Sequence, residues 1–315
     1  SSGMAAILST CMALLQSGDH IVCSRDVFGS TTVLLNKFMA KMGIQTTYVA
    51  LTDLDAWKEA CQNNTKLFFL ESPSNPICEV ADIPALAEIA KSTGAWLVVD
   101  NCFATPILQK PLALGADIVI HSMTKYVNGH SSSIAGAAMG PYEFFSTDVF
   151  MAYKDFGPTP SPFDSWLNSL CIQDLGLRVQ IQSETAVKIA NFLNDHPKVQ
   201  KVTYPGLESH PQHHIFLKQM RNGGAMISFE VKGGFEGGVK LMNYFARKDT
   251  PMELAVSLGS VISYIEHPAS MTHCIVPKED RDIRGINDSL VRLSVGAEGY
   301  GTLMRALDEG LALID

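Results

Sequence analysis

The sequence predicts an α/β protein in which a large, doubly wound, mostly parallel domain precedes a smaller α+β domain. Over the first 175 residues, short apolar runs alternate with helical patterns. Runs that are apolar throughout are typical of strands buried on both faces of a parallel sheet. Past that point the alternation gives way to longer strands and amphipathic helices. We therefore expect a first domain at 1–175 and a C-terminal domain at 176–315.

The expected elements follow one another along the first domain. Helical patterns cover about 4–16, 30–42, 53–62 and 82–93. Strands are expected at HIVC, TTYVA, KLFFLE, AWLVVD and ADIVIH. A Pro-rich stretch, FGPTPSPFDSW, then precedes a long helix over about 175–194. In the C-terminal domain, GAMISFEV and SLVRLSV predict strands, while FEGGVKLMNYFA and GTLMRALDEGLALI predict helices.

Composition excludes several classes of protein. The net charge is −8 without a basic block, which argues against nucleic-acid partners and anionic membranes. No apolar stretch approaches the roughly 18 residues of a membrane span. Seven scattered cysteines without CxxC pairs indicate reduced thiols in a cytoplasmic protein. His210, His213 and His214 lie in a Pro-containing turn that we expect to be a solvated loop, so no metal site is predicted.

An acid and an amine 25 residues apart are the most informative pair. Asp100 ends AWLVVD, and Lys125 follows ADIVIH in HSMTKY. Both face the crevice at the carboxyl ends of the strands, where open α/β sheets bind ligands. Pyridoxal phosphate (PLP) needs both groups, a lysine for its aldehyde and a carboxylate for its pyridine nitrogen. Taken alone, Asp100 could be a cap or turn residue, and Lys125 could be a solvated side chain.

Two segments offer anion sites. Ser2-Gly3-Met4 precedes a helix, whose unpaired N–H groups favour a phosphate, although an ordinary Ser N-cap has the same pattern. Ser122 and Thr124 flank Lys125 and can bind phosphate oxygens or form a simple turn.

Two further polar residues have alternative interpretations. Asn75, in the extended turn ESPSNP, could donate its amide to a phenolic oxygen or be structural. Arg292 interrupts the strand LVRLSV and could grip an α-carboxylate or form an internal ion pair.

These segments together resemble a known family. SGMAAI, ESPSNP, VVDNCFATP, HSMTKYVNGH, SLG, HPASMTH and RLSVGAE occur in the order found in the cystathionine γ-lyase/γ-synthase (Cys/Met-metabolism) family of PLP enzymes, from residue 1 to about 313. The resemblance implies the aspartate-aminotransferase-like fold (fold type I). It also implies a homotetramer whose active sites are shared between subunits.

The resemblance assigns roles to matching residues. Lys125 would form the Schiff base with PLP, Asp100 would pair with the pyridine nitrogen, and Asn75 would approach the ring oxygen. Glu71 would lie behind these residues, and Phe28 would stack on the ring. The phosphate would be bound by Gly3, Met4, Ser122 and Thr124. Ser257 would lie close to the lysine, and Arg292 would clamp the substrate carboxylate.

The chain departs from the family pattern in several places. The family's Tyr-x-Arg element lies upstream of SGM, so we expect an N-terminal segment to be missing here through truncation or disorder. Phe28 stands where many members carry Tyr. Val256 stands where members that cleave cystathionine carry an acid, and Ser30 where methionine γ-lyases carry a reactive Cys. These departures argue against a dedicated lyase.

We therefore expect a PLP-dependent γ-replacement enzyme. Its substrate would be an O-acylhomoserine, O-succinyl before O-acetyl, and its acceptor sulfide or a small thiol, giving homocysteine or a thioether. A cystathionine γ-synthase, a γ-lyase acting on cystathionine or methionine, and a non-catalytic PLP-binding scaffold remain alternatives. Retention of Asp100, Lys125 and Arg292 argues against the scaffold.

Overall fold

The computed structural model describes residues 1–272, 274 and 278–315. The chain forms two compact units. The first comprises Ser1–Asn75, Glu79–Asn128 and Ser132–Ile172, and the second comprises Pro76–Cys78, Gly129–Ser131 and Gln173–Asp315. Among the described residues, no helix combines the length and the apolar character needed to cross a membrane.

The first unit is built on a six-stranded sheet in the order β2-β1-β3-β4-β5-β6. Five strands are parallel, and only β6 runs antiparallel to its neighbour β5. The strands are β1 (His20–Ser24), β2 (Gln45–Val49), β3 (Thr65–Glu71), β4 (Trp96–Asp100), β5 (Ile118–Ser122) and β6 (Gly136–Met139). The doubly wound, mostly parallel prediction is confirmed. The Gly-Ala-rich β6 was not expected.

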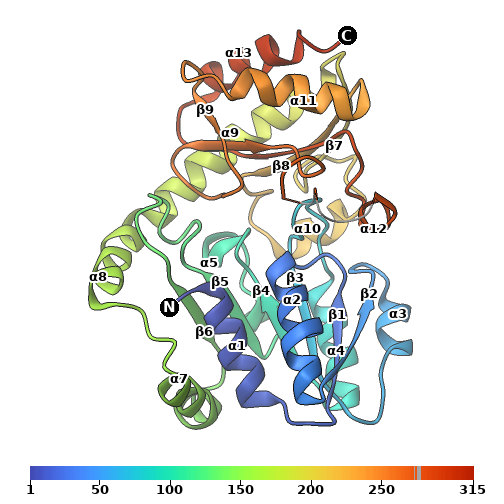
Figure 1. The fold of residues 1–315 in the computed structure, drawn as a ribbon, viewed down its shortest axis with the longest axis vertical. Helices are drawn as coiled ribbons and strands as arrows, with labels where there is room; N and C mark the ends of the chain where they lie inside the picture. Colours follow the sequence, from blue (N-terminus) through green and yellow to red (C-terminus); the bar gives the residue numbers. More distant parts are fainter. Residues whose placement is uncertain (273, 275–277) are drawn as a thin grey trace. The chain divides into compact units, whose positions relative to one another are not determined.

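Helices cover both faces of this sheet, because alternate residues of each buried strand point to opposite sides. On one face, side chains of β1, β3, β4 and β5 pack against α1 (Gly3–Leu14) and η1 (Leu34–Met39). Figure 1 shows α1 and α2 (Gly29–Val33) in front of the strands. On the other face, the intervening side chains pack against α4 (Ile83–Thr93) and Trp57 of α3 (Leu54–Glu59).

Short helices complete the first unit. The Pro-rich stretch contains a helix that was not expected, α8 (Pro162–Cys171), whose first residue is a proline and whose cap is Ser161. The others are η2 (Ala40–Met42), α5 (Thr105–Leu108), η3 (Pro111–Leu114), α6 (Tyr142–Phe144), η4 (Phe145–Val149) and α7 (Phe150–Phe156). The short η5 (Ile172–Asp174) spans the point of the chain where the first unit ends.

The second unit is α+β. Its five-stranded mixed sheet has the order β7-β8-β11-β10-β9. The strands are β7 (Val199–Thr203), β8 (Met226–Val231), β9 (Met252–Leu254), β10 (Ser263–Glu266) and β11 (Leu290–Ser294). The helices are α9 (Leu175–Asp195), α10 (His213–Gln219), α11 (Gly234–Phe245), α12 (Lys278–Ile283) and α13 (Tyr300–Leu311). His273, the last residue of HPASMTH, lies outside the described residues.

One expectation about this unit is wrong. His210 does not lie in a solvated loop: it is buried, and its Nε2 is 3.1 Å from the carbonyl oxygen of Cys78. Burial lowers the pKa of His210 to about 4, so its imidazole is a neutral packing group.

Candidate active site

Polar side chains gather at the carboxyl edge of the first sheet. Because β3, β4 and β5 are parallel, their last residues meet at one edge. Glu71 and Asp100 are direct register partners, and Ser122 ends β5 beside them. Alternation along the strands places all three on the face that α1 covers.

The N-terminus of α1 reaches this edge. The oxygens of Ser2 accept the N–H groups of Ala5 (3.0 Å) and Ala6 (3.1 Å), as an ordinary N-cap does. The N–H groups of Gly3 and Met4 have no acceptor within the helix. A Cβ on Gly3 would lie 2.7 Å from Cβ of Ser122, so only glycine allows α1 to approach β5 this closely. The helix start therefore directs two N–H donors beside Ser122.

Asp100 is held by the residue two positions further on. The N–H of Cys102 donates to Oδ1 of Asp100 (2.9 Å), and the Cys102 thiol donates to the same carboxylate. The N–H of Ser122 in turn donates to Sγ of Cys102 (2.7 Å). Burial, and then the charge of Asp100, holds the pKa of Cys102 well above its usual value, so the thiol keeps its proton.

Glu71 connects the sheet edge to the loop that carries Phe28. The N–H of Phe28 donates to Oε1 of Glu71 (2.6 Å), and the Phe28 residue is 49% exposed. Burial raises the pKa values of both Glu71 and Asp100, and the charge of Asp100 raises that of Glu71 further. The edge thus contains two acids that resist simultaneous ionisation.

Lys125 lies in the turn after β5, where its N–H donates to the carbonyl oxygen of Ser122 (3.2 Å). The hydroxyl of Thr124 lies 3.2 Å from the N–H and 3.3 Å from the carbonyl oxygen of Ala135. The Thr124 side chain is therefore bonded to the segment that precedes β6 and not within a local Ser/Thr turn. Asn75 is half-buried in the turn after β3. An amine, an acid and a helix N-terminus thus share one edge, which suits a ligand that has a carbonyl, a basic nitrogen and a phosphate.

Arg292 and Ser257 belong to the second unit. Nη1 of Arg292 is 2.9 Å from Oε1 of Glu266, and both side chains are almost fully buried. Nη2 donates to the carbonyl oxygens of Val256 (3.0 Å) and Ser257 (3.1 Å). The internal ion pair considered for Arg292 is therefore present, and the same guanidinium fixes the backbone at Ser257.

Cys102 was missed as a site residue. The sequence signal was its place two residues after Asp100 in VVDNC, where an Asp side chain commonly accepts the N–H two residues on. Its contact with Ser122 crosses from β4 to β5 and has no signature in the sequence.

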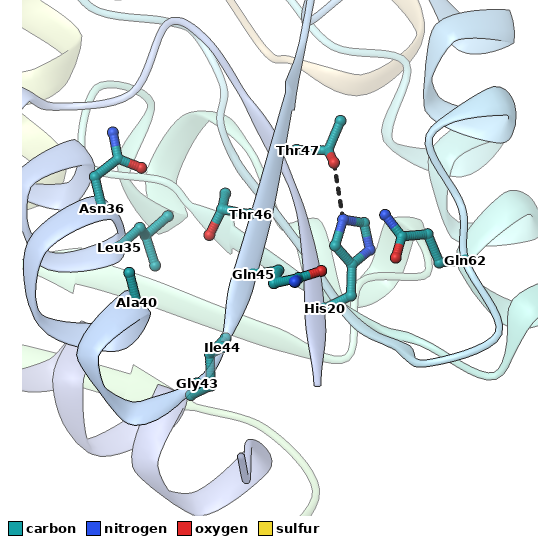
Figure 2. Close-up of a pocket in the computed structure, with 10 residues that line it drawn as sticks. All are labelled: His20, Leu35, Asn36, Ala40, Gly43, Ile44, Gln45, Thr46, Thr47 and Gln62. Atoms are coloured by element: carbon teal, nitrogen blue, oxygen red, sulfur yellow. Dashed lines mark hydrogen bonds between the residues drawn. The ribbon is translucent and has the colours of Figure 1, made fainter. Parts of the chain in front are cut away.

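A separate hollow of ≈ 580 Å³ lies at the opposite edge, around the first residues of β1 and β2. Figure 2 shows His20 and Gln62 on one side of β2 and Leu35 and Thr46 on the other, so the hollow wraps around an edge strand. His20 is held by hydroxyls of Thr47 (2.9 Å) and Thr65 (2.8 Å). None of the predicted site residues lines this hollow.

Comparison with known proteins agrees with the chemistry of the carboxyl edge. The chain is 45% identical to O-succinylhomoserine sulfhydrylase of Pseudomonas aeruginosa over 99% of this chain and 76% of that protein. It is 45% identical to an L-methionine gamma-lyase of Fusobacterium nucleatum subsp. polymorphum over 100% of this chain and 79% of that protein. It is 42% identical to a cystathionine gamma-synthase of Mycobacterium tuberculosis over 99% of this chain and 78% of that protein.

The family model for Cys/Met metabolism PLP-dependent enzymes matches residues 1–312. This match covers both units and includes every residue of the carboxyl edge described above. The chain therefore belongs to the family of PLP-dependent enzymes of cysteine and methionine metabolism.

Proposed function

We propose that this protein catalyses γ-replacement on O-succinylhomoserine, or O-acetylhomoserine, with sulfide or a thiol, giving homocysteine or a thioether in methionine and cysteine biosynthesis. The observation that carries the proposal is the shared edge of Asp100, Lys125 and the α1 N-terminus. Similarity to an O-succinylhomoserine sulfhydrylase supports the choice of substrate.

The residues of the first unit fit PLP. The close approach of Gly3 to Ser122 leaves the N–H groups of Gly3 and Met4 for a phosphate, a role that the Ser122 hydroxyl can share. Asp100, kept in place by two donors from Cys102, is suited to a protonated ring nitrogen. Asn75 would serve the ring oxygen, and Thr124 would serve the phosphate. When bound, PLP supplies an electron sink next to the substrate's α-carbon.

The protein's own groups then hold and move protons. Lys125 would hold the cofactor's aldehyde, and its ε-amino group would move protons at Cα and Cβ of the substrate. Asp100 would keep the proton on the ring nitrogen. Phe28, whose backbone is fixed by Glu71, would cover the ring.

The second unit would hold the substrate. Arg292 would bind the α-carboxylate, which would replace the carbonyl oxygens of Val256 and Ser257 as acceptors of its Nη2 donors. Glu266 would keep its contact with Nη1. We propose residues 1–175 as the cofactor domain and 176–315 as the C-terminal domain.

The absence of a hydroxyl on Phe28 favours an acylated substrate. A carboxylate has a pKa of about 4 and leaves without a proton, whereas a thiol of pKa about 8.5 leaves poorly as a bare thiolate. A site without a phenol over the ring therefore handicaps thioether cleavage more than acyl displacement. The main alternative is a γ-lyase, which the similarity to an L-methionine gamma-lyase favours.

Steady-state kinetics test this choice. We expect kcat/KM to be highest for O-succinylhomoserine with sulfide, with homocysteine as the product. Release of an α-keto acid from cystathionine or methionine at a higher kcat/KM would establish the lyase instead. A Lys125→Ala variant is the control, because any turnover that survives it comes from elsewhere.

We also propose a homotetramer with active sites shared between subunits, in the cytoplasm. Support for self-association comes from large apolar side chains exposed on two helices of the first unit, where monomers rarely leave such a surface uncovered. These side chains are Phe150, Met151 and Phe156 of α7 and Phe163, Trp166 and Leu170 of α8. Scattered cysteines support a reducing compartment.

A further inference from the structure

We propose that Glu71 and Asp100 form a paired-carboxylate site that holds one proton at neutral pH, with Glu71 as the protonated member and as the residue that positions Phe28. The pairing rests on the geometry of the first unit. Its consequence for PLP rests on the function proposed above.

Strand register brings the two acids together. Glu71 and Asp100 are Cα partners on adjacent parallel strands and share the face covered by α1. Neighbouring strands lie about 4.8 Å apart. Glu71 is only 6% exposed. Asp100 is half-buried beside it. Two carboxylates on directly paired positions, one of them almost fully shielded from water, cannot both ionise without a large cost, so one proton is retained between them.

The hydrogen bonds decide which member keeps the proton. Asp100 accepts both the N–H and the thiol of Cys102, and such donors favour the ionised form. Glu71 accepts one backbone N–H, that of Phe28. The donors to Asp100 therefore stabilise its ionised form more than the single donor stabilises ionised Glu71. Burial disfavours the charged form of Glu71, so Glu71 keeps the proton.

The surrounding charges support the same assignment. Asp26, in the loop after β1, adds a further negative charge that raises the pKa of Glu71. Lys125 follows β5 at the same edge. On the face that α1 covers, further titratable groups are the thiols of Cys11 in α1, Cys23 in β1 and Cys102 after β4, whereas His20, Lys66 and His121 alternate to the opposite face of their strands.

A single charge has a chemical consequence. A protonated ring nitrogen beside Asp100 is neutralised by one carboxylate, and a second ionised acid would leave the site with an excess negative charge. The neutral Glu71 can still accept the N–H of Phe28 through its carbonyl oxygen. Glu71 thus sets the position of Phe28 without adding charge.

Infrared spectroscopy of the protein without PLP tests the proton directly. At about pH 7 we expect a protonated-carboxyl band that disappears in Glu71→Gln. Glu88→Gln, which removes an exposed acid of α4, is the matched control and should leave the band unchanged. In Asp100→Asn the band should persist but titrate at lower pH, because the neighbouring charge is gone. If the native protein shows no such band, both acids are ionised and the proposal is wrong.

PLP affinity tests the positioning role. Glu71→Gln keeps a neutral acceptor for the N–H of Phe28 and should change the Kd for PLP by less than about threefold, whereas Glu71→Leu should weaken it about tenfold. Equal weakening by both variants would show that Glu71 acts through its charge and would overturn the proposal. If the native protein retains the infrared band yet does not bind PLP, the carboxylate pair stands and the proposed function fails.

Discussion

In the second unit, the buried acid Glu266 lies opposite Arg292, whereas in the first unit the acid Glu71 lies opposite another acid, Asp100. The Glu266–Arg292 pair is neutral within itself and is closed by backbone contacts. The Glu71–Asp100 pair has no such internal balance, and we propose that its charge is balanced by a ligand. Buried ion pairs can be satisfied by the fold alone, and like-charged pairs are typical of sites that bind or transform something else.

The largest expected effect concerns Asp100. Asp100→Asn keeps the shape of the side chain but removes the charge that keeps the ring nitrogen protonated, so we expect kcat to fall by about 10³-fold, or about 4 kcal/mol. The measurement is kcat at saturating PLP. Asp117→Asn is the control, since Asp117 precedes β5 at the opposite edge of the sheet and only accepts the N–H of Leu97. Equal losses in the two variants would contradict a special role for the carboxyl edge.

The second test breaks the matched pair. Arg292→Leu leaves Glu266 buried without its cation and should lower the free energy of unfolding by about 3–5 kcal/mol. Adding Glu266→Leu should recover most of that loss. Denaturant unfolding of the native protein, the two single variants and the double variant would measure it. If the double variant is as unstable as the single one, the ion pair is not what Arg292 contributes to the fold.

A third test uses a neutral group beside the site. His121 is buried in β5, and burial lowers its pKa to about 4. The unfolded chain therefore binds this proton first, and stability is lost as pH falls from about 6.5 to about 4. The difference in unfolding free energy between the native protein and His121→Gln should shrink by about 3 kcal/mol over that window.

Alternation places His121 on the opposite side of β5 from Ser122, so His121→Gln should leave the affinity for PLP unchanged. A constant stability difference across the pH window would show that His121 is protonated in the folded state.

The smallest expected effect concerns Phe28. Adding a hydroxyl over the ring gives a proton donor for a departing sulfur, so Phe28→Tyr should raise kcat/KM for cystathionine about tenfold and leave that for O-succinylhomoserine nearly unchanged. If Phe28→Tyr changed kcat/KM by the same factor for both substrates, the ring would be only a stacking surface. Cystathionine as the better substrate of the native enzyme would contradict the leaving-group argument.

The parallel strands of the first unit and the residues at their carboxyl ends were predictable from the sequence, because continuous apolar runs are typical of buried parallel strands. Asp100 and Lys125 follow such runs, and their placement was predicted. Strand β6 was missed because Gly-Ala-Ala-Met has little β-propensity and pairs only through its backbone. Helix α8 was missed because prolines precede it and its proline occupies the first turn.

Side-chain partners could not be predicted in the same way. The contact of Glu71 with Phe28 joins residues 43 apart, and that of Cys102 with Ser122 joins residues 20 apart. Both depend on strand register, which no local pattern encodes. An internal ion pair was one of two alternatives for Arg292, because a charge inside an apolar strand needs a partner. The sequence does not identify Glu266 as that partner.

Borohydride reduction of the native protein with PLP, followed by peptide mapping, tests the central claim most directly. The carboxyl edge of the first unit is proposed to hold the cofactor through Lys125. We expect the reduced cofactor on the peptide that contains HSMTKY, attached to Lys125, and no labelled peptide in Lys125→Ala. A label on any other lysine would contradict the assignment of this edge as the cofactor site.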